Sequence, residues 1–264
     1  MGEDLTAPEP ILRVDQVAKA FGGVQALSRV SFDLYPGDVF GIIGPNGSGK
    51  TSLVNSITGF VKVDSGRVFF KDREITNKPP HKIADLGVTR TFQVMRPYYG
   101  LPAYKNLVVP LFSPRARRTG GWRGGGRSGS RDTVSVDILE EIGFERDSYV
   151  PYKQASALPT GYLKRLELAR CLALRPEIII CDEIFSGLSM SEMASMLPLI
   201  ERLRDEGVTL IMVEHRLREL FRVSRRIMVL NFGMKLIEGP PDVVMADEKV
   251  KEAYFGSEEI LSYV

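Results

Sequence analysis

Cysteine is scarce in this sequence, and long hydrophobic runs are missing. The two cysteines, Cys171 and Cys181, lie among aliphatic residues without the spacing of metal ligands, which predicts reduced core residues in a cytosolic protein and excludes a disulfide scaffold. No apolar run approaches the roughly 18 to 20 residues that span a bilayer. The acidic segment 1–10 also lacks the basic-then-apolar pattern of a signal peptide. We therefore expect a chain that does not cross a membrane by itself.

A large excess of charge of one sign is also absent. The 35 Lys and Arg residues and the 33 Asp and Glu residues leave a formal charge of +2, which is too balanced for a protein that coats nucleic acid. The chain has 264 residues, of which 44% are hydrophobic and 26% charged. This composition is close to that of an average globular protein and excludes disorder of the whole chain.

Two segments lack the pattern of packed structure. Residues 1–10 carry acidic residues and two prolines, and we expect a flexible arm there. Residues 113–131 contain six Arg, six Gly and no acidic residue, so the other residues carry 2 − 6 = −4. Such a composition is typical of a mobile surface loop. The alternative is contact with anionic lipid headgroups or another polyanion, in which Trp122 enters the membrane interface.

Short β-branched runs alternate with helical stretches along the rest of the chain. Strands are expected at 11–14, 31–34, 39–43, 178–181, 208–213 and 227–230. Helices are expected at 51–59, 134–142 and 161–174. The alternation predicts an α/β fold with a parallel sheet. We expect residues 11–264 to form one domain, with a helical subdomain inserted at about 94–175.

A glycine-rich segment lies between the strand at 39–43 and the helix at 51–59. It carries two glycines separated by four residues, followed by Lys50 and Thr51, as in phosphate-binding P-loops. Glycines let successive backbone N–H groups surround phosphates, and the helix dipole adds partial positive charge. The residues expected around the phosphates are Gly44, Asn46, Gly47, Ser48, Gly49, Lys50, Thr51 and Ser52. Lys50 would pair with β- and γ-phosphate oxygens, and Thr51 would offer its hydroxyl to Mg²⁺. The alternative is a glycine turn with an exposed lysine.

Three further chemical groups follow predicted strands. Asp182 and Glu183 follow the strand at 178–181, at the sheet edge where α/β proteins bind ligands. Asp182 would hold the Mg²⁺ shell, through water, and Glu183 would polarise an attacking water. Two such acids could instead cap a following helix. His215 follows the strand at 208–213, and we expect it to bind the γ-phosphate and the attacking water, although a lone His after a strand is more often structural.

These motifs and their order resemble those of the nucleotide-binding subunits of ABC transporters, from Val14 to Gly256. Phe21 matches the aromatic position of that family's adenine-stacking loop, with packing of an apolar side chain as the alternative. Gln93, in TRTFQ, matches the glutamine loop, which touches Mg²⁺ and water. Residues 158–162 (LPTGY) occupy the signature position, and residues 186–189 (SGLS) occupy the loop after the catalytic Glu. The resemblance thus implies a P-loop NTPase core with an N-terminal antiparallel β subdomain and an inserted helical subdomain. It also implies the use of ATP and Mg²⁺, with Glu183, His215 and Gln93 as catalytic residues.

The resemblance also implies an assembly. ATP would lie between one subunit's P-loop and the signature motif of a second ABC ATPase subunit, so Gly161 would contact the partner's ATP. Two transmembrane permease subunits would dock near Gln93 and the segment 94–101, and an extracellular or periplasmic solute-binding protein would complete an importer. The expected place is the cytoplasmic face of the cell membrane, as a peripheral protein, with no nucleic acid bound.

The subfamily is indicated by smaller features. TRTFQ, RLELAR, the pair Glu214-His215 and the segment 253–256 are similar to ATPases of branched-chain amino acid importers. Import of these amino acids or of a related small solute is therefore expected. Several of the same traits occur in lipopolysaccharide-export ATPases, which stay an alternative. Two others are a soluble ABC-type ATPase that acts on nucleic acid or in cofactor assembly, and a non-hydrolysing regulatory subunit.

The signature region departs from the family pattern. Pro159 stands where a serine is usual and has neither a hydroxyl nor a backbone N–H for a phosphate. Thr160, Tyr162, Ile184 and Ser189 are also unusual for their positions. Because the chain's own P-loop and acids are intact, we expect a heterodimer in preference to a homodimer. The site on this chain's P-loop would then hydrolyse ATP, whereas the site completed by LPTGY would hydrolyse it poorly.

Overall fold

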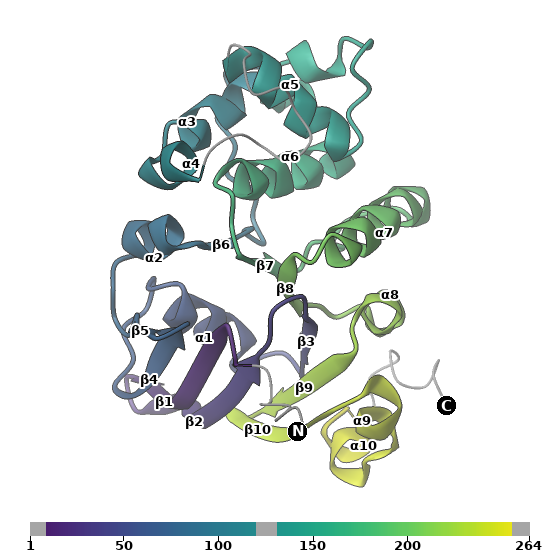
Figure 1. Cartoon of the computed structure of the whole chain (residues 1–264). Coiled ribbons are helices and arrows are strands. Elements are labelled where there is room, and N and C mark those ends of the chain that lie inside the picture. Colours follow the sequence, from purple (N-terminus) through teal and green to yellow (C-terminus); the bar gives the residue numbers. More distant parts are fainter. Residues whose placement is uncertain (1–8, 120–130, 255–264) are drawn as a thin grey trace, which may run out of the picture.

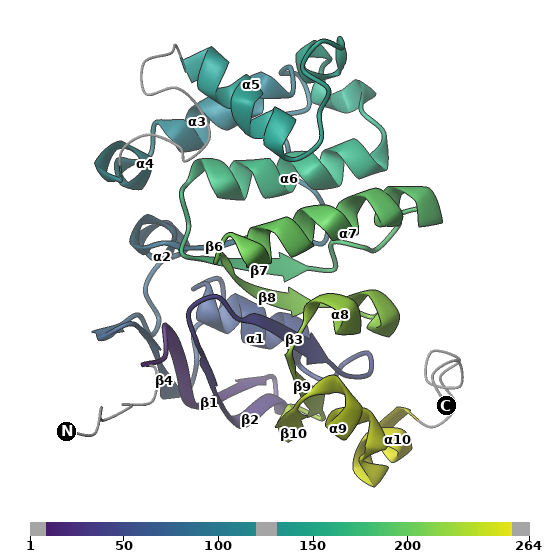
Figure 2. The same ribbon diagram turned by 45° about the vertical axis from the view of Figure 1, so that its right-hand side comes forward.

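The structure is a computed structural model and describes residues 9–119 and 131–254. The expected arm therefore lies almost wholly outside the described residues, as does Trp122. Two sheets organise the chain, and Figures 1 and 2 both show sheet A on one side of sheet B and the helices α3–α6 on the other.

Sheet A is antiparallel, with the strand order β2-β1-β4-β5. Its strands are β1 (Leu12–Phe21), β2 (Val24–Leu34), β4 (Ser65–Phe70) and β5 (Arg73–Glu74). The expected segments 11–14 and 31–34 are short parts of the longer strands β1 and β2. The predicted N-terminal antiparallel unit is confirmed.

Sheet B has the strand order β10-β9-β3-β8-β7-β6. Its strands are β3 (Val39–Ile43), β6 (Val88–Arg90), β7 (Ile178–Asp182), β8 (Thr209–Val213), β9 (Arg226–Asn231) and β10 (Met234–Gly239). All neighbours are parallel except β9 and β10. The α/β prediction is confirmed, whereas β6 and β10 were not expected from the sequence because β6 is short and β10 is not buried.

Alternating side chains of sheet B enter two separate cores. In β7, Ile178 and Ile180 pack into the core with sheet A and α1 (Lys50–Ile57), whereas Ile179 and Cys181 pack into the core with α6 (Thr160–Ala173) and its neighbours. A strand that is buried on both faces is hydrophobic at every position. This double burial explains the continuous apolar runs in the sequence.

Helices and short 3-10 helices connect the strands. Those between β4 and β7 are α2 (Pro80–Leu86), η1 (Tyr104–Leu107), α3 (Val108–Leu111), α4 (Pro114–Arg118), α5 (Arg131–Glu141), η2 (Val150–Tyr152), η3 (Ala155–Ala157) and α6. Those after β7 are α7 (Met190–Asp205), α8 (Leu217–Val223), α9 (Pro241–Ala246) and α10 (Glu248–Tyr254). In the described part of 94–175 every regular element is a helix, and the boundaries proposed for a helical subdomain there stay a prediction.

The expected loop at 113–131 is wrong at both ends. Residues 114–118 form α4, and Arg131 begins α5. Ser113 caps α4 by accepting a hydrogen bond from Ala116 N at 3.1 Å, and Pro114 occupies the first turn. Arg115 is 9% exposed and donates hydrogen bonds to the carbonyls of Arg175 and Leu86. Buried hydrogen bonding therefore overrides the glycine-rich composition at the start of this segment.

Both cysteines are free and buried, as predicted. Burial raises the pKa of the Cys171 thiol to about 12. Among residues 9–119 and 131–254, no helix combines the length and the apolar character needed to cross a bilayer.

Candidate functional site

The glycine-rich segment connects β3 to α1 at the carboxyl edge of sheet B. Gly44 has φ +154°, and a Cβ there would lie 2.1 Å from the Leu230 carbonyl oxygen. Gly49 has φ +107°, and a Cβ there would lie 2.5 Å from the Ala26 carbonyl oxygen. Both positions therefore require glycine, because the backbone conformation and the close neighbouring backbone exclude a side chain.

Lys50 is 6% exposed, which contradicts the alternative of an exposed lysine. Its Nζ donates to the Gly44 and Pro45 carbonyls at 2.7 and 3.0 Å, within the segment itself. Ser48 Oγ is buried and has no hydrogen-bond partner among the residues that the structure describes. This segment suits an anionic phosphate, because it combines an ammonium, an unpartnered hydroxyl and a helix N-terminus without acidic residues in its first turn.

The other residues expected in the P-loop lie in the same segment and at the start of α1. Asn46 and Gly47 are exposed, Thr51 is exposed at the start of α1, and Ser52 is half-buried. A cavity of about 620 Å³ opens beside them and is lined by Pro45, Asn46, Gly47, Ser48, Asn231, Phe232, Leu236, Lys249, Glu252 and Ala253. Lys249, Glu252 and Ala253 belong to α10 (Glu248–Tyr254), so this C-terminal helix lines the cavity together with P-loop residues.

Asp182 ends β7 and is 2% exposed. Its Oδ2 accepts a hydrogen bond from Arg90 Nη2 at 2.7 Å, and its backbone N donates to Thr91 Oγ1 at 3.1 Å. Burial raises the pKa of Asp182, while the guanidinium of Arg90 opposes that shift. The structure thus places this acid at the strand end, paired with an arginine to which the sequence analysis assigned no role.

The structure brings Glu183, Gln93 and His215 together. Gln93 Nε2 donates to Glu183 Oε2 at 2.8 Å, and His215 Nε2 lies 3.1 Å from Glu183 Oε1. Glu183 has φ +52°, a conformation rare for residues other than glycine. A strained backbone and two partners on one carboxylate are typical of a catalytic group held in position.

Two buried ionisable residues support the Glu183 loop and were not predicted from the sequence. Lys164 Nζ donates to the Glu183 carbonyl at 2.9 Å, and burial lowers the pKa of Lys164. Glu214 Oε1 accepts a hydrogen bond from Phe185 N at 3.1 Å, and burial raises the pKa of Glu214 to about 8. Lys164 lies in the helix that follows the signature position, and Glu214 precedes His215, so only the tertiary contacts relate them to Glu183.

Gly161 lies in the first turn of α6. Its backbone N donates to Glu192 Oε1 at 3.1 Å within the same chain. Glu192 also forms a capping box with Ser189, the first-turn cap of α7. The N–H expected to face a partner's ATP is therefore engaged by a carboxylate of this chain, and the exposed Ser189 has a structural role.

Phe21 ends β1 at its hairpin with β2 and is 47% exposed, with Lys19 Nζ 5.2 Å from its ring centre. An aromatic ring so exposed disfavours the alternative of a packing residue.

In the described ranges, no group of three or more His, Cys, Asp and Glu side chains is placed to hold a metal ion. The Thr51 hydroxyl, the Asp182 carboxylate and the Gln93 amide are nevertheless the oxygen ligands that Mg²⁺ prefers. They fit a Mg²⁺ whose other ligands are phosphate and water oxygens.

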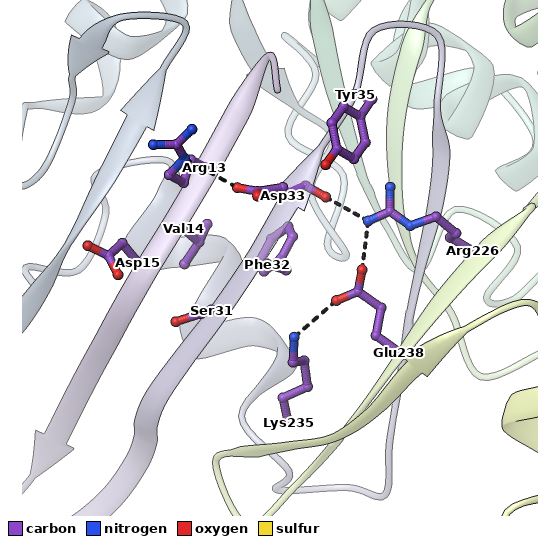
Figure 3. Close-up of a pocket in the computed structure, with 10 residues that line it drawn as sticks. All are labelled: Arg13, Val14, Asp15, Ser31, Phe32, Asp33, Tyr35, Arg226, Lys235 and Glu238. Atoms are coloured by element: carbon purple, nitrogen blue, oxygen red, sulfur yellow. Dashed lines mark hydrogen bonds and ion pairs between the residues drawn. The ribbon is translucent and has the colours of Figure 1, made fainter. Parts of the chain in front are cut away.

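A second cavity, of about 390 Å³, lies between the two sheets and away from the P-loop (Figure 3). It is lined by Arg13, Val14, Asp15, Ser31, Phe32, Asp33, Tyr35, Arg226, Lys235 and Glu238. Several of its charged side chains are paired with one another, Arg226 with Glu238 at 2.6 Å and Lys235 with Glu238 at 3.1 Å.

The sequence matches two protein-family models. Residues 27–186 match the ABC transporter family, and residues 235–260 match the branched-chain amino acid ATP-binding cassette transporter family. The second match covers β10, α9 and α10, which include the elements beside the P-loop cavity.

Relatives and solved structures agree with these matches. The high-affinity branched-chain amino acid transport ATP-binding protein LivG of Escherichia coli is 34% identical, covering 94% of this chain and 98% of LivG. The probable protein of that name from Archaeoglobus fulgidus is 34% identical, covering 94% of this chain and 96% of its own length. A crystal structure of an ATP-binding cassette of an ABC transporter in its ADP conformation is 33% identical, with a TM-score of 0.79, covering 94% of this chain and all of its own.

Proposed function

This chain belongs to the ABC transporter family of ATP-binding proteins, and from that premise we propose that it is the ATP-hydrolysing subunit of an importer for branched-chain amino acids. The observation that carries the enzymatic part is the Glu183 carboxylate held by both Gln93 and His215, at the same carboxyl edge of sheet B as the P-loop. The cargo is proposed from the C-terminal family match at 235–260 and from the names of the relatives. The same match favours this importer over a lipopolysaccharide exporter or a soluble ATPase.

Different residues have different roles in the proposed hydrolysis. Lys50 and the backbone N–H groups from Gly47 to Thr51 bind the phosphates of ATP, since Lys50 can exchange its two carbonyl partners for phosphate oxygens. Thr51, Asp182 and Gln93 hold Mg²⁺, which neutralises phosphate charge when bound. Glu183 accepts a proton from the attacking water. His215 and Gln93 orient that carboxylate.

The partners are proposed from the chain's exposed surfaces. Segment 94–101 presents Val94, Tyr98 and Tyr99, which are 72, 44 and 48% exposed, beside Gln93. Large exposed side chains of this kind are common at interfaces, and we assign this segment to the docking of two permease subunits. A solute-binding protein would deliver the cargo on the other side. The chain would then lie on the cytoplasmic face of the membrane as a peripheral protein.

A second, different ATPase subunit completes the proposed assembly. Pro159 lacks a backbone N–H, and the N–H of Gly161 already donates to Glu192. The signature position therefore offers a partner's ATP fewer free donors than this chain's own P-loop offers. A heterodimer with one hydrolysing and one weakly hydrolysing site follows from this difference.

Purification of the tagged chain from its host in mild detergent tests these proposals. We expect a polytopic membrane pair, a second ATPase polypeptide and ATP turnover. Glu183→Gln should lower that turnover at least about 100-fold, whereas the matched control Glu201→Gln, in a surface ion pair with Arg222, should leave it within about twofold.

Several outcomes would contradict the proposals. Unchanged turnover in Glu183→Gln would remove Glu183 as the base. Only one ATPase polypeptide in the complex would contradict the heterodimer. Copurification with soluble proteins or nucleic acid alone would favour the soluble ATPase.

A further inference from the structure

Arg90, the last residue of β6, joins the elements that carry the proposed Mg²⁺ ligands. Its side chain is 7% exposed. Nη2 donates to Asp182 Oδ2 at 2.7 Å, Nη1 donates to Asn55 Oδ1 at 2.6 Å, and Nε donates to the Thr91 carbonyl at 3.3 Å. One guanidinium therefore contacts β7, α1 and the segment that leads to Gln93.

Two aromatic rings fix the plane of this guanidinium. Phe92 and Phe60 have their ring centres 4.9 and 5.5 Å from Arg90 Cζ, and the two rings meet edge to face at 5.6 Å. Rings at these distances attract a cation and restrict its rotation. Phe92 immediately precedes Gln93, so the position of the Gln93 segment depends on the arginine.

The proposed ligands themselves lie on three separate elements. Thr51 lies at the start of α1, one turn before Asn55, and Asp182 ends β7. Gln93 lies after β6. Because Mg²⁺ demands near-ideal octahedral geometry, its binding depends on the spacing between these elements more than on any one of them.

We propose that Arg90 is a positioning residue that sets the spacing of Thr51, Asp182 and Gln93 and thereby determines how strongly Mg²⁺ enhances nucleotide binding. The inference rests on the proposed function. A lysine is a poor substitute, since a single ammonium lacks the planar fork that reaches Asp182 and Asn55 together.

The test measures equilibrium binding of a fluorescent ATP analogue to the purified chain, with Mg²⁺ and with excess EDTA. In Arg90→Met we expect the ratio of the affinity with Mg²⁺ to the affinity with EDTA to fall about tenfold or more. This is the size of effect that follows the loss of a hydrogen bond to a charged group. Arg90→Lys should show a smaller fall. Asn55→Ala, which removes only the contact with α1, should lower the ratio about threefold.

Arg226→Met is the matched control. Arg226 also binds carboxylates, Asp38 at 2.9 Å and Glu238 at 2.6 Å, and also lies against two rings, Tyr35 and Phe40, with Cζ 5.3 and 5.1 Å from their centres. Its neighbours do not include a proposed Mg²⁺ ligand, so the affinity ratio should stay at the wild-type value even if the melting temperature falls.

The outcomes separate the two proposals. Equal affinity ratios in wild type, Arg90→Met and Arg226→Met would overturn the role of Arg90 and leave ATP binding intact. If Arg90→Met does not fold, an unchanged ratio in Asn55→Ala overturns it. Failure of the wild-type chain to bind the nucleotide at all would instead contradict the proposed function.

Discussion

The two edges of sheet B carry similar arginine networks with different surroundings. Arg90 ends β6 at the carboxyl edge, and Arg226 begins β9 at the amino edge, in the cavity of Figure 3. Each guanidinium binds a carboxylate at less than 3 Å and contacts two aromatic rings. Arg90 is 7% exposed, however, and Arg226 is 26% exposed.

The two arginine networks connect different parts of the protein. Arg226 connects sheet A to sheet B, because Nη2 donates to the Asp33 carbonyl of β2 and to Glu238 of β10. Arg90 connects α1 to Asp182, the residue before the Glu183 carboxylate that has two partners. Similar ion pairs therefore stabilise the fold at one edge and position reacting groups at the other.

The largest expected difference in nucleotide affinity is between alanine variants of two glycines. Gly44→Ala at the carboxyl edge places a Cβ 2.1 Å from a carbonyl oxygen, whereas a Cβ at Gly37, with φ +76°, meets no atom of the described residues within 4 Å. Strain of about 1–3 kcal/mol in the P-loop should lower nucleotide affinity about ten- to 100-fold in Gly44→Ala. Gly37→Ala should cost about 1–2 kcal/mol of stability and leave affinity unchanged. Titration of both variants with a fluorescent nucleotide checks this, and equal affinities would contradict it.

Arg226→Met should mainly affect stability. Asp38 and Glu238 would lose their guanidinium partner while staying about one-quarter and one-fifth exposed, so the free energy of unfolding should fall by about 2 kcal/mol. Urea unfolding measures this change. Turnover per folded molecule, measured well below the melting temperature, should match that of the wild type. A large loss of turnover would show that the two edges are coupled.

The smallest expected effect concerns the pH dependence of stability. Burial raises the pKa of Glu214 to about 8 from 4.5, with Lys164 and Glu183 as the charged groups that face it. Between these values the folded state keeps a proton that the unfolded state loses, so stability falls as pH rises, by at most about 1.4 kcal/mol per pH unit.

Glu214→Gln removes that proton and keeps an acceptor for Phe185 N. The wild type should therefore lose about 1–2 kcal/mol more stability than Glu214→Gln between about pH 6 and pH 8. Urea unfolding at both pH values checks this. Parallel losses in the two proteins would show that Glu214 is already ionised when folded.

Much of the fold was accessible from sequence because its signals are local. The predicted strand at 39–43 coincides with β3, and the predicted helix at 161–174 differs from α6 by one residue at each end. Segment 113–131 was misjudged at its start, since its composition gave no sign that Arg115 would be buried against Arg175 and Leu86. Composition describes the average of a segment, whereas one buried side chain can order five residues.

The local pattern of glycines, Lys50 and strand-end acids was enough to predict a phosphate site and, by resemblance, to identify the family. This is possible because phosphate binding needs successive backbone N–H groups at one turn, which a short motif encodes. Tertiary structure alone decided that Arg90 reaches Asn55 and Asp182, and that Gln93 and His215 reach one carboxylate. Those partners are 32 to 92 residues apart in the chain, and only the packing of strands and helices brings side chains so distant within hydrogen-bonding distance.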